Sequence, residues 1–231
     1  MTVPRWYAAA GPAYLAVLLA VDTQVDLEAQ LVLGAVTWFV LVAAIWPLAT
    51  IMRAQVIGVV LFATVAEVTG SLIWGVYRYR LHNLPLFIPP AHGLVYLSGV
   101  ALAAVIPARA LVAVAAAGSV GWGLAGITVL PRLDVAGALC VPLLVAFLWQ
   151  SRFRAAYAGV FVVVAALELY GTSIGVWRWA GSLPGLGIAQ GNPPSGVASG
   201  YVWFDVMALL VAPSLVVGTR TVRARLAPAA A

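Results

Sequence analysis

Apolar residues along this chain form eight long stretches, separated by short segments that are polar, proline-rich or marked by arginine. Apolar segments of about 17 to 25 residues can cross a bilayer as helices, because a helix satisfies its own backbone hydrogen bonds. The pattern predicts an all-α bundle of about eight transmembrane helices. Seven is the alternative, because the first stretch is short and prolines blur the limits of the fourth to sixth. The predicted helices cover roughly residues 7–21, 29–52, 55–76, 91–108, 110–131, 135–150, 155–177 and 199–218.

Composition indicates the same class of protein. Hydrophobic residues make up 64% of the 231 residues and charged residues only 8%, which is too little polar surface for a soluble domain of this size. Residues 1–231 are therefore expected to form a single transmembrane domain. The net charge of +5 does not indicate nucleic-acid binding, because the arginines stand at the ends of apolar stretches, where they orient a protein in the bilayer.

The arginines also predict the orientation in the membrane. An N-terminus inside the cell places most of them on the cytoplasmic side and leaves four outside, at Arg78, Arg80, Arg132 and Arg178. Both termini are then cytoplasmic, and residues 219–231 form a basic tail there. The N-terminus lacks a basic n-region and a small-residue cleavage site, so the first helix is expected to be retained rather than removed as a signal peptide.

Two segments of the chain repeat each other. The first reads Glu67-Val-Thr-Gly70-Ser71 and then Gly75-Val-Tyr-Arg-Tyr79; the second reads Glu168-Leu-Tyr-Gly171-Thr172 and then Gly175-Val-Trp-Arg-Trp179. Their offset is 101 residues at the glutamates and 100 after a single-residue slip. The match predicts two parallel four-helix repeats, at about 1–109 and 110–218, related by an axis along the membrane normal. The alternative is a packing motif used twice, in which small residues let helices approach closely.

Glu67 and Glu168 are the main functional candidates. A charged side chain at mid-membrane costs about 2.5 to 3.5 kcal/mol to insert, so a pair at matching positions indicates a function. Glu67 lies ten residues before Tyr77, which on a continuous helix places it about 15 Å below the aromatic belt. Burial disfavours the charged form of a carboxyl group, and two nearby carboxylates cannot both ionise cheaply. One is therefore expected to donate a proton and the other to accept one.

The segments after the two motifs are expected to cap the outer mouth of a central cavity. Both contain proline pairs, and each carries an asparagine, Asn83 in the first and Asn192 in the second. Irregular backbone at membrane depth is tolerated only where it is buried in protein or lines a wet cavity. Arg78 and Arg178 would stand at the rim, either as a clamp for an anionic headgroup or diphosphate, or as anchors that reach the lipid headgroups.

Two further titratable residues are candidate acid–base groups. His92 begins the fourth predicted span, and Asp205 lies one turn inside the eighth. Each also has a structural interpretation. His92 is then a buried histidine that only packs, and Asp205 is an acidic residue that interacts favourably with a helix dipole. No clustered metal-ligand spacing and no nucleotide fingerprint occurs in the sequence, so neither a metal nor a cofactor is expected.

Aromatic residues concentrate around these groups. The candidate substrate-binding aromatics are Trp74, Tyr77, Tyr96, Tyr170, Trp177, Tyr201 and Trp203, with Tyr79 and Trp179 beside them. Their ring faces would stabilise cations. Aromatic belts at the membrane interface explain many of them equally well.

A small multi-pass chain with acidic residues in its membrane helices and no metal motif resembles the membrane-embedded terpene cyclases of meroterpenoid pathways and, more loosely, the membrane carotenoid cyclases. In those families a carboxylic acid protonates an alkene or epoxide and starts a carbocation cascade in an apolar pocket. The Glu-x-x-Gly and Asn192-Pro-Pro-Ser-Gly196 patterns also resemble uncharacterised multi-pass proteins of high-GC bacteria. That likeness implies no function. The expected location is the cell membrane, in a bacterium the inner membrane.

These features predict a metal-independent membrane enzyme that cyclises or isomerises an isoprenoid or another lipid. A proton-coupled transporter or lipid carrier is the alternative, because paired carboxylates and a parallel repeat also suit one. A scaffold without chemistry of its own is disfavoured by the buried acids. The expected partners are a hydrophobic small molecule and membrane lipids, and self-association into a homo-oligomer is left open.

Overall fold

The computed structural model describes residues 3–226 of the chain. These residues form eight α-helices, a π-helical turn and two short strands, which confirms the all-α prediction and the number of helices. The predicted basic tail at 219–231 begins within the last helix, and residues 227–231 lie outside the described part of the chain. In chain order the elements are α1 (Tyr7–Asp22), α2 (Leu27–Ile45), α3 (Thr50–Glu67), η1 (Val68–Trp74), β1 (Tyr77–Tyr79), α4 (Ile88–Val105), α5 (Ala108–Thr128), α6 (Val135–Gln150), α7 (Arg154–Ser173), β2 (Trp177–Trp179) and α8 (Val197–Leu226).

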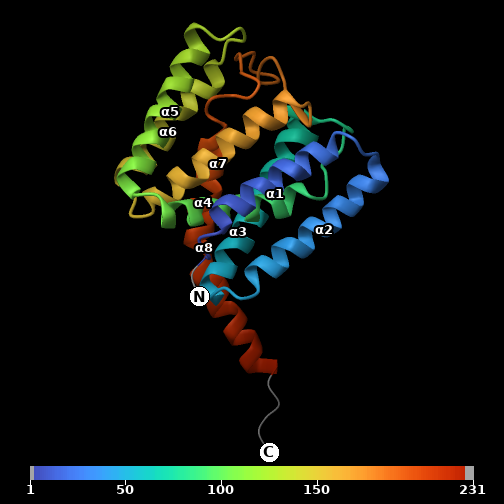
Figure 1. Ribbon diagram of the computed structural model, residues 1–231, viewed down its shortest axis with the longest axis vertical. Helices are drawn as coiled ribbons and strands as arrows, with labels where there is room; N and C mark the ends of the chain where they lie inside the picture. Colours follow the sequence, from blue (N-terminus) through green and yellow to red (C-terminus); the bar gives the residue numbers. More distant parts are fainter. Residues whose placement is uncertain (1–2, 227–231) are drawn as a thin grey trace, which may run out of the picture.

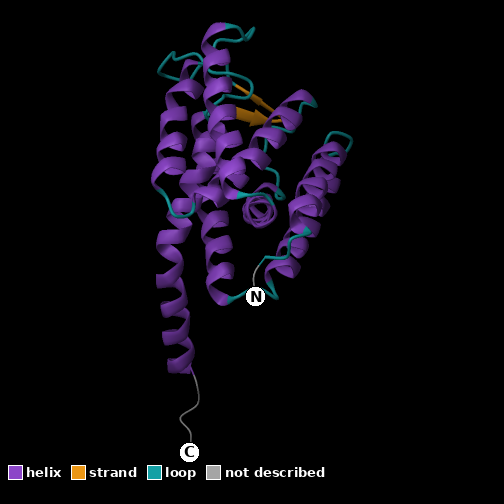
Figure 2. Ribbon diagram, turned by 60° about the vertical axis from the view of Figure 1, so that its left-hand side comes forward, coloured by secondary structure: helices purple, strands orange, loops and turns teal. Residues whose placement is uncertain are grey.

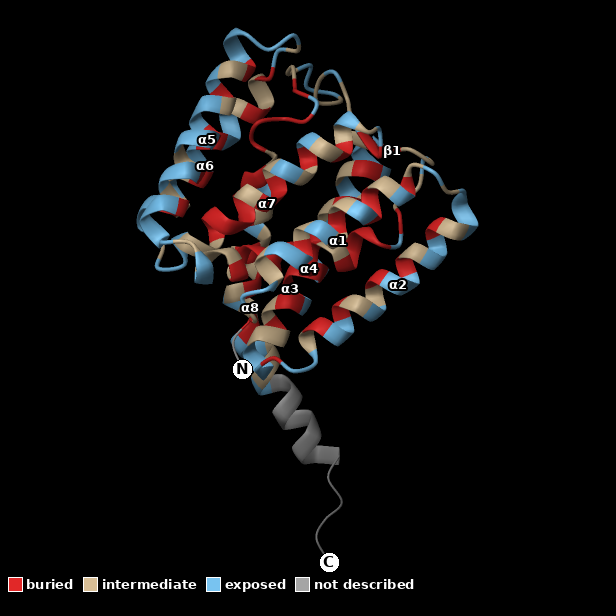
Figure 3. Ribbon diagram, in the orientation of Figure 1, coloured by how far each residue is buried: buried red, intermediate tan, exposed pale blue. Residues whose placement is uncertain are grey.

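Six of these helices are long and apolar enough to cross a membrane: α2, α3 with η1, α4, α5, α7 and α8. The helices α1 and α6 are apolar but span only 16 residues each. Large apolar side chains point outward, such as Phe39 at 74% and Trp149 at 81% exposed, and Figure 3 shows the buried residues on the inner faces. Soluble proteins rarely expose so much contiguous apolar surface. The chain is therefore a multi-pass membrane protein.

Prolines explain two differences from the predicted helix limits. The second predicted span ran to residue 52, but α2 ends at Ile45, because Pro47 has no backbone N–H group with which to continue the helical hydrogen-bond pattern. In contrast, α4 begins at Ile88, earlier than predicted, with Pro89 and Pro90 in its first turn, where the missing N–H group costs nothing. His92 therefore lies one turn inside α4.

The centre of the bundle consists of α3, α4, α7 and α8. Helix α3 packs on α8, and α4 packs on α7 (Figure 1). Both pairs approach closely because they meet at small residues: Gly58 lies against Ala208, and Gly159 lies against Gly99. The two contacts occupy corresponding places, since Gly58 and Gly159 are 101 residues apart and Gly99 and Ala208 are 109 apart.

The outer helices do not share this correspondence. Helix α1 packs mainly on α4, whereas α5 packs on α6 and α7. Figure 1 shows α2 on one side of the bundle and the α5–α6 pair on the other. The likeness between the two halves is confined to the four central helices and the turns after α3 and α7, which falls short of the two four-helix repeats that the sequence predicts.

The chain reverses after α3 and again after α7 at a glycine with a positive φ, 75° at Gly75 and 80° at Gly175. The first reversal is preceded by the π-helical turn η1. A π turn is wider than an α turn and accommodates one additional residue. It therefore explains the single-residue slip between the two sequence motifs.

Beyond these turns, β1 and β2 pair as an antiparallel ribbon, drawn in orange in Figure 2. Tyr77 pairs with Trp179, Arg78 with Arg178, and Tyr79 with Trp177. Successive strand residues point to opposite faces, so the four aromatic side chains share one face and the two arginines share the other. The sequence did not predict this ribbon, because helices were expected to continue to residues 76 and 177.

Candidate functional site

A cavity of about 450 Å³ lies beneath the aromatic face of the ribbon. Its walls come from α1, α3, α4, α6, α7, α8 and the loop between β2 and α8. Most of the lining is apolar. The polar groups that reach the cavity include the two predicted carboxylates and the predicted histidine, Glu67, Glu168 and His92.

Glu67 is the last residue of α3, and its side chain is held by the strand that folds back over it. The hydroxyls of Tyr77 and Tyr79 both donate hydrogen bonds to Oε2 of Glu67, at 2.6 and 2.7 Å. Burial, and then the neighbouring Glu67, raise the pKa of both tyrosine hydroxyls, so both keep their protons and remain donors. The ring of Tyr77 fits because Gly70 has no side chain: a Cβ there would stand 3.1 Å from the ring.

Glu168 has the corresponding arrangement with tryptophan in place of tyrosine. The indole N–H groups of Trp177 and Trp179 both donate to Oε2 of Glu168, at 2.9 and 3.2 Å. A side chain at Gly171 would overlap the ring of Trp177. The glycine of each Glu-x-x-Gly motif thus makes room for the aromatic ring that binds the glutamate one turn earlier, rather than for a neighbouring helix.

These bonds correct the predicted depth of Glu67. The estimate of about 15 Å below Tyr77 assumed a continuous helix. The helix instead ends at Trp74, and the turn at Gly75 brings the Tyr77 hydroxyl back to the carboxylate.

His92 stands beside the other oxygen of Glu67. Its Nδ1 atom lies 2.9 Å from the carbonyl oxygen of Ile88, which can only accept a hydrogen bond, so Nδ1 carries a proton. Its Nε2 atom lies 3.4 Å from Oε1 of Glu67. Nε2 is buried and has no hydrogen-bond partner among the residues that the structure describes. Nε2 of His92 and Oε1 of Glu67 therefore face each other across a short gap in the buried interior.

No family model matches this chain, and no curated protein or solved structure shows significant similarity to it. The function must therefore be inferred from the geometry of the cavity.

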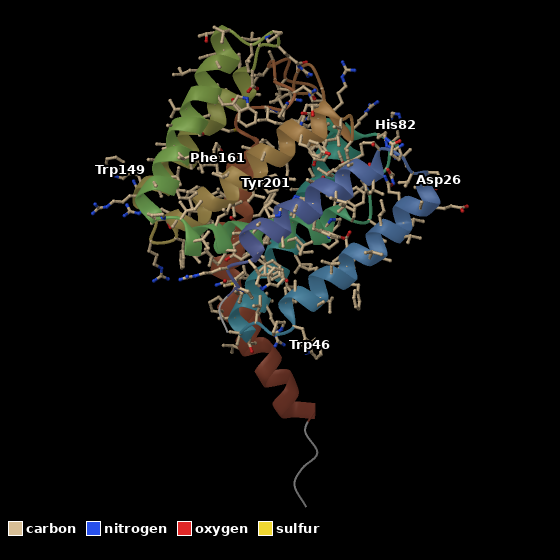
Figure 4. All side chains as sticks on the ribbon, viewed as in Figure 1. Asp26, Trp46, His82, Trp149, Phe161 and Tyr201 are labelled. Atoms are coloured by element: carbon tan, nitrogen blue, oxygen red, sulfur yellow. The ribbon has the colours of Figure 1, made fainter. Side chains whose placement is uncertain are left out.

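Aromatic rings form much of the wall around the three titratable groups. The ring of Tyr201 stacks on that of His92 at a centroid distance of 5.0 Å, and Phe204 meets the same imidazole edge-on at 6.1 Å. Figure 4 shows Tyr201 inside the bundle, whereas Trp46 and Trp149 point away from it. Of the predicted aromatics, Trp74, Tyr77, Trp177 and Tyr201 line the cavity.

Arg78 and Arg178 do not reach the cavity, because strand alternation turns them to the outer face of the ribbon. Both are exposed, and neither forms an ion pair with a side chain that the structure describes. Arg78 instead lines a second hollow of about 340 Å³, beside His82 and Asn83. An anion held by these arginines would therefore lie outside the ribbon.

The other predicted site residues also lie away from the cavity. Trp203 is 49% exposed on the outer face of α8, and Tyr170 does not line the cavity either. Asn83 donates to the side chain of Gln30, and Asn192 accepts the backbone N–H of Trp179, so both brace loops. Tyr96 and Asp205 are buried one turn beyond His92 and Tyr201.

Three further residues shape the site. Tyr79 and Trp179 were expected among the aromatics near the acids but were not assigned to substrate binding; an alternation of period two places each on one face with its neighbour in the motif. Asp134 caps α6 and also accepts hydrogen bonds from Gly191 and Ser195, which ties the loop before α8 to the bundle. Nothing in the sequence around Asp134 indicates that distant contact.

Proposed function

We propose that this protein is a membrane enzyme that cyclises or isomerises an isoprenoid or a related unsaturated lipid by proton transfer. The observation that carries the proposal is that Glu67, Glu168 and His92 all line one apolar, aromatic-walled cavity. An apolar space suits a hydrocarbon substrate, and aromatic faces stabilise carbocations. This is the activity that the resemblance to membrane terpene cyclases implies.

The neighbours of the two glutamates differ in one respect that bears on their roles. Hydrogen bonds from two side chains stabilise the carboxylate form of each, from Tyr77 and Tyr79 at Glu67 and from Trp177 and Trp179 at Glu168. Glu67 also has an imidazole beside it, with Nε2 of His92 3.4 Å from Oε1, and an imidazole can accept and deliver a proton. We therefore assign the Glu67–His92 pair as the proton donor and Glu168 as the base.

The reaction follows from these roles. A proton carried by the Glu67–His92 pair passes from Glu67 to one carbon of an alkene, which leaves the neighbouring carbon cationic. A second double bond of the same molecule attacks that cation to close a ring, or the cation loses a different proton without closure. Glu168 accepts the proton whose loss restores a double bond, so substrate and product have equal mass.

The likeness of the two helix pairs fits this division of labour. An approximate twofold relation between α3 with α4 and α7 with α8 would set Glu67 and Glu168 on opposite walls of the cavity. Their differences, tyrosine against tryptophan and His92 against Tyr201, make one wall acidic and the other basic. The arginine distribution orients both termini toward the cytoplasm, in what we take to be a bacterial inner membrane.

A proton-coupled carrier for a small molecule or lipid is the second candidate. The same approximate symmetry favours it, because related halves around a central site are common in secondary transporters. A carrier would bind its ligand in this cavity and release it unchanged.

The test is mass spectrometry of lipid extracts from a host that expresses the protein, with isoprenoid lipids resolved by chromatography. An enzyme of this kind yields a product of unchanged mass and altered retention. That product disappears with Glu67→Gln and with Glu168→Gln, and persists with Glu28→Gln, a matched change of an exposed glutamate in the first turn of α2. Equal product from all three variants would rule out acid–base catalysis by the cavity glutamates. Unaltered lipids in the host that expresses the wild-type protein would favour the carrier.

A further inference from the structure

A second group of buried polar side chains lies below the cavity and is not part of it. Asp205 in α8 is 2% exposed, and its Oδ2 atom has no hydrogen-bond partner among the described residues. Two further buried hydroxyl groups, those of Tyr96 in α4 and Tyr157 in α7, lie on the neighbouring central helices. The Tyr96 hydroxyl donates to Oε1 of Gln55 in α3, at 3.2 Å. Each of the four central helices thus contributes one polar side chain.

This group continues the cavity toward the cytoplasmic ends of the helices. Asp205 lies one helical turn beyond Tyr201, and Tyr96 lies one turn beyond His92, the two rings that stack in the cavity wall. Gln55 lies near the start of α3, is only partly buried, and precedes Glu67 by a rise of about 18 Å at 1.5 Å per residue. The side chains therefore form a column from a partly exposed amide to the Glu67–His92 pair.

The column contains groups that can pass a proton. Carboxyl, hydroxyl and imidazole groups both donate and accept hydrogen bonds, whereas the surrounding residues of these helices are mostly aliphatic. Two buried atoms along it lack partners, Nε2 of His92 at the cavity and Oδ2 of Asp205 below it. Buried polar atoms without partners are costly and are found where a water molecule or a proton transfer occupies the gap.

We propose that Asp205 and Tyr96 form a proton path that connects the Glu67–His92 pair to the cytoplasmic side, where the partly exposed Gln55 side chain accepts the Tyr96 hydroxyl at the outer end of the path. The proposal rests on the proposed function, because only a donor that gives up its proton must be recharged. After each turnover Glu67 lacks a proton and Glu168 has gained one. A proton that arrives through Asp205 restores Glu67 without requiring Glu168 to return its own across an occupied cavity. Asp205 acts through His92 and is a positioning and relay residue rather than a group that contacts the substrate.

The experiment is hydrogen–deuterium exchange of the buried carboxyl groups, followed by infrared spectroscopy after transfer of the purified protein into D₂O. The band of Glu67 is identified by its loss in Glu67→Gln. We expect Asp205→Asn to slow exchange of that band by about tenfold or more, which corresponds to about 1.4 kcal/mol in the barrier. Tyr96→Phe should slow it in the same direction, and it provides the test if Asp205→Asn does not fold.

The matched control is Ser119→Ala in α5, which changes another buried polar side chain without a described hydrogen-bond partner, away from the column. In Ser119→Ala the Glu67 carboxyl group should exchange at the wild-type rate. Exchange at the wild-type rate in both Asp205→Asn and Tyr96→Phe, or equal slowing by Ser119→Ala, would overturn the path. The exchange experiment needs no substrate, so it is independent of the lipid assay. If the wild-type protein forms the lipid product but neither Asp205→Asn nor Tyr96→Phe slows exchange of Glu67, the proton path is rejected and the proposed enzyme activity is not.

Discussion

Gly159 in α7 lies so close to Gly99 in α4 that a Cβ atom on Gly159 would overlap the carbonyl oxygen of Gly99. This contact joins the helix that carries Glu168 to the helix that carries His92. The width of the cavity between them therefore depends on a glycine pair about two turns or more from either group.

Gly159→Ala should destabilise the protein by about 1 to 3 kcal/mol, because α4 and α7 must separate to admit the methyl group. The measurement is the unfolding temperature in detergent. Gly121→Ala in α5 is the control, since a Cβ there meets nothing within 4 Å. It should be neutral or slightly stabilising, because alanine favours helix more than glycine does. Equal unfolding temperatures for the two variants would show that the α4–α7 contact is not tight.

Tyr77→Phe and Tyr79→Phe should each lower stability by about 1 to 3 kcal/mol, because each removes a donor from a buried carboxyl group. Tyr14→Phe is the comparison: its hydroxyl shares a hydrogen bond with the uncharged Thr37 side chain, at 2.9 Å. That change should cost about 0.5 to 1.5 kcal/mol. Unfolding temperatures of the three variants test the order, and a larger loss for Tyr14→Phe would contradict the role assigned to the two strand tyrosines.

His92→Asn should reduce product formation by a factor of about 10² to 10⁴, the usual contribution of a positioned acid–base group. The reason is that Glu67 would lose the imidazole whose Nε2 atom faces its Oε1 atom at 3.4 Å and supplies it with a proton in the proposed mechanism. His82→Asn is the matched control and should leave product formation unchanged, because His82 is exposed. Its φ of 58° is a backbone conformation that asparagine tolerates. Product per amount of folded protein is the measurement. Wild-type yield from His92→Asn would remove the histidine from the mechanism.

Asp134→Asn should loosen the loop between β2 and α8. Its Oδ2 atom accepts hydrogen bonds from both the backbone N–H and the hydroxyl of Ser195, each at 2.6 Å, and an amide group there would place a donor against these donors. Limited proteolysis should cut residues 189–196 faster than in the wild type. Asp26→Asn, at an exposed helix cap, should change nothing, because asparagine caps as well as aspartate does. If Asp134→Asn resists proteolysis in that loop as well as the wild type does, contacts other than those of Asp134 hold the loop in place.

The sequence predicted well wherever a feature depends on neighbouring residues. About eight membrane-spanning helices were expected from the lengths of the apolar stretches; eight helices are present in the described residues, and six of them are long and apolar enough to cross a membrane. The two glutamate motifs also proved equivalent, because each uses the same local sequence to place a glycine, a reversal and two aromatic side chains around one carboxylate.

Local sequence was a poor guide to position where the rotation of a helix or the direction of a turn decides which way a side chain points. Trp203 and Tyr201 are two residues apart on α8, yet only Tyr201 lines the cavity. Arg78 lies between two cavity residues, yet the strand turns it outward. Nothing in the local sequence indicates that the helix predicted over residues 55–76 ends early. The chain reverses at Gly75, and the strand that follows, β1, pairs with the distant strand β2.

The sequence alone therefore determined that this is a multi-pass helical membrane protein with two buried glutamates in matching motifs, because helix length and local spacing are properties of short segments. Only the tertiary structure decided that both glutamates share one cavity, that His92 stands beside Glu67, and that Asp205 lies below them. These relationships join helices far apart in the chain. They are fixed by how small residues such as Gly99 and Gly159 let those helices meet.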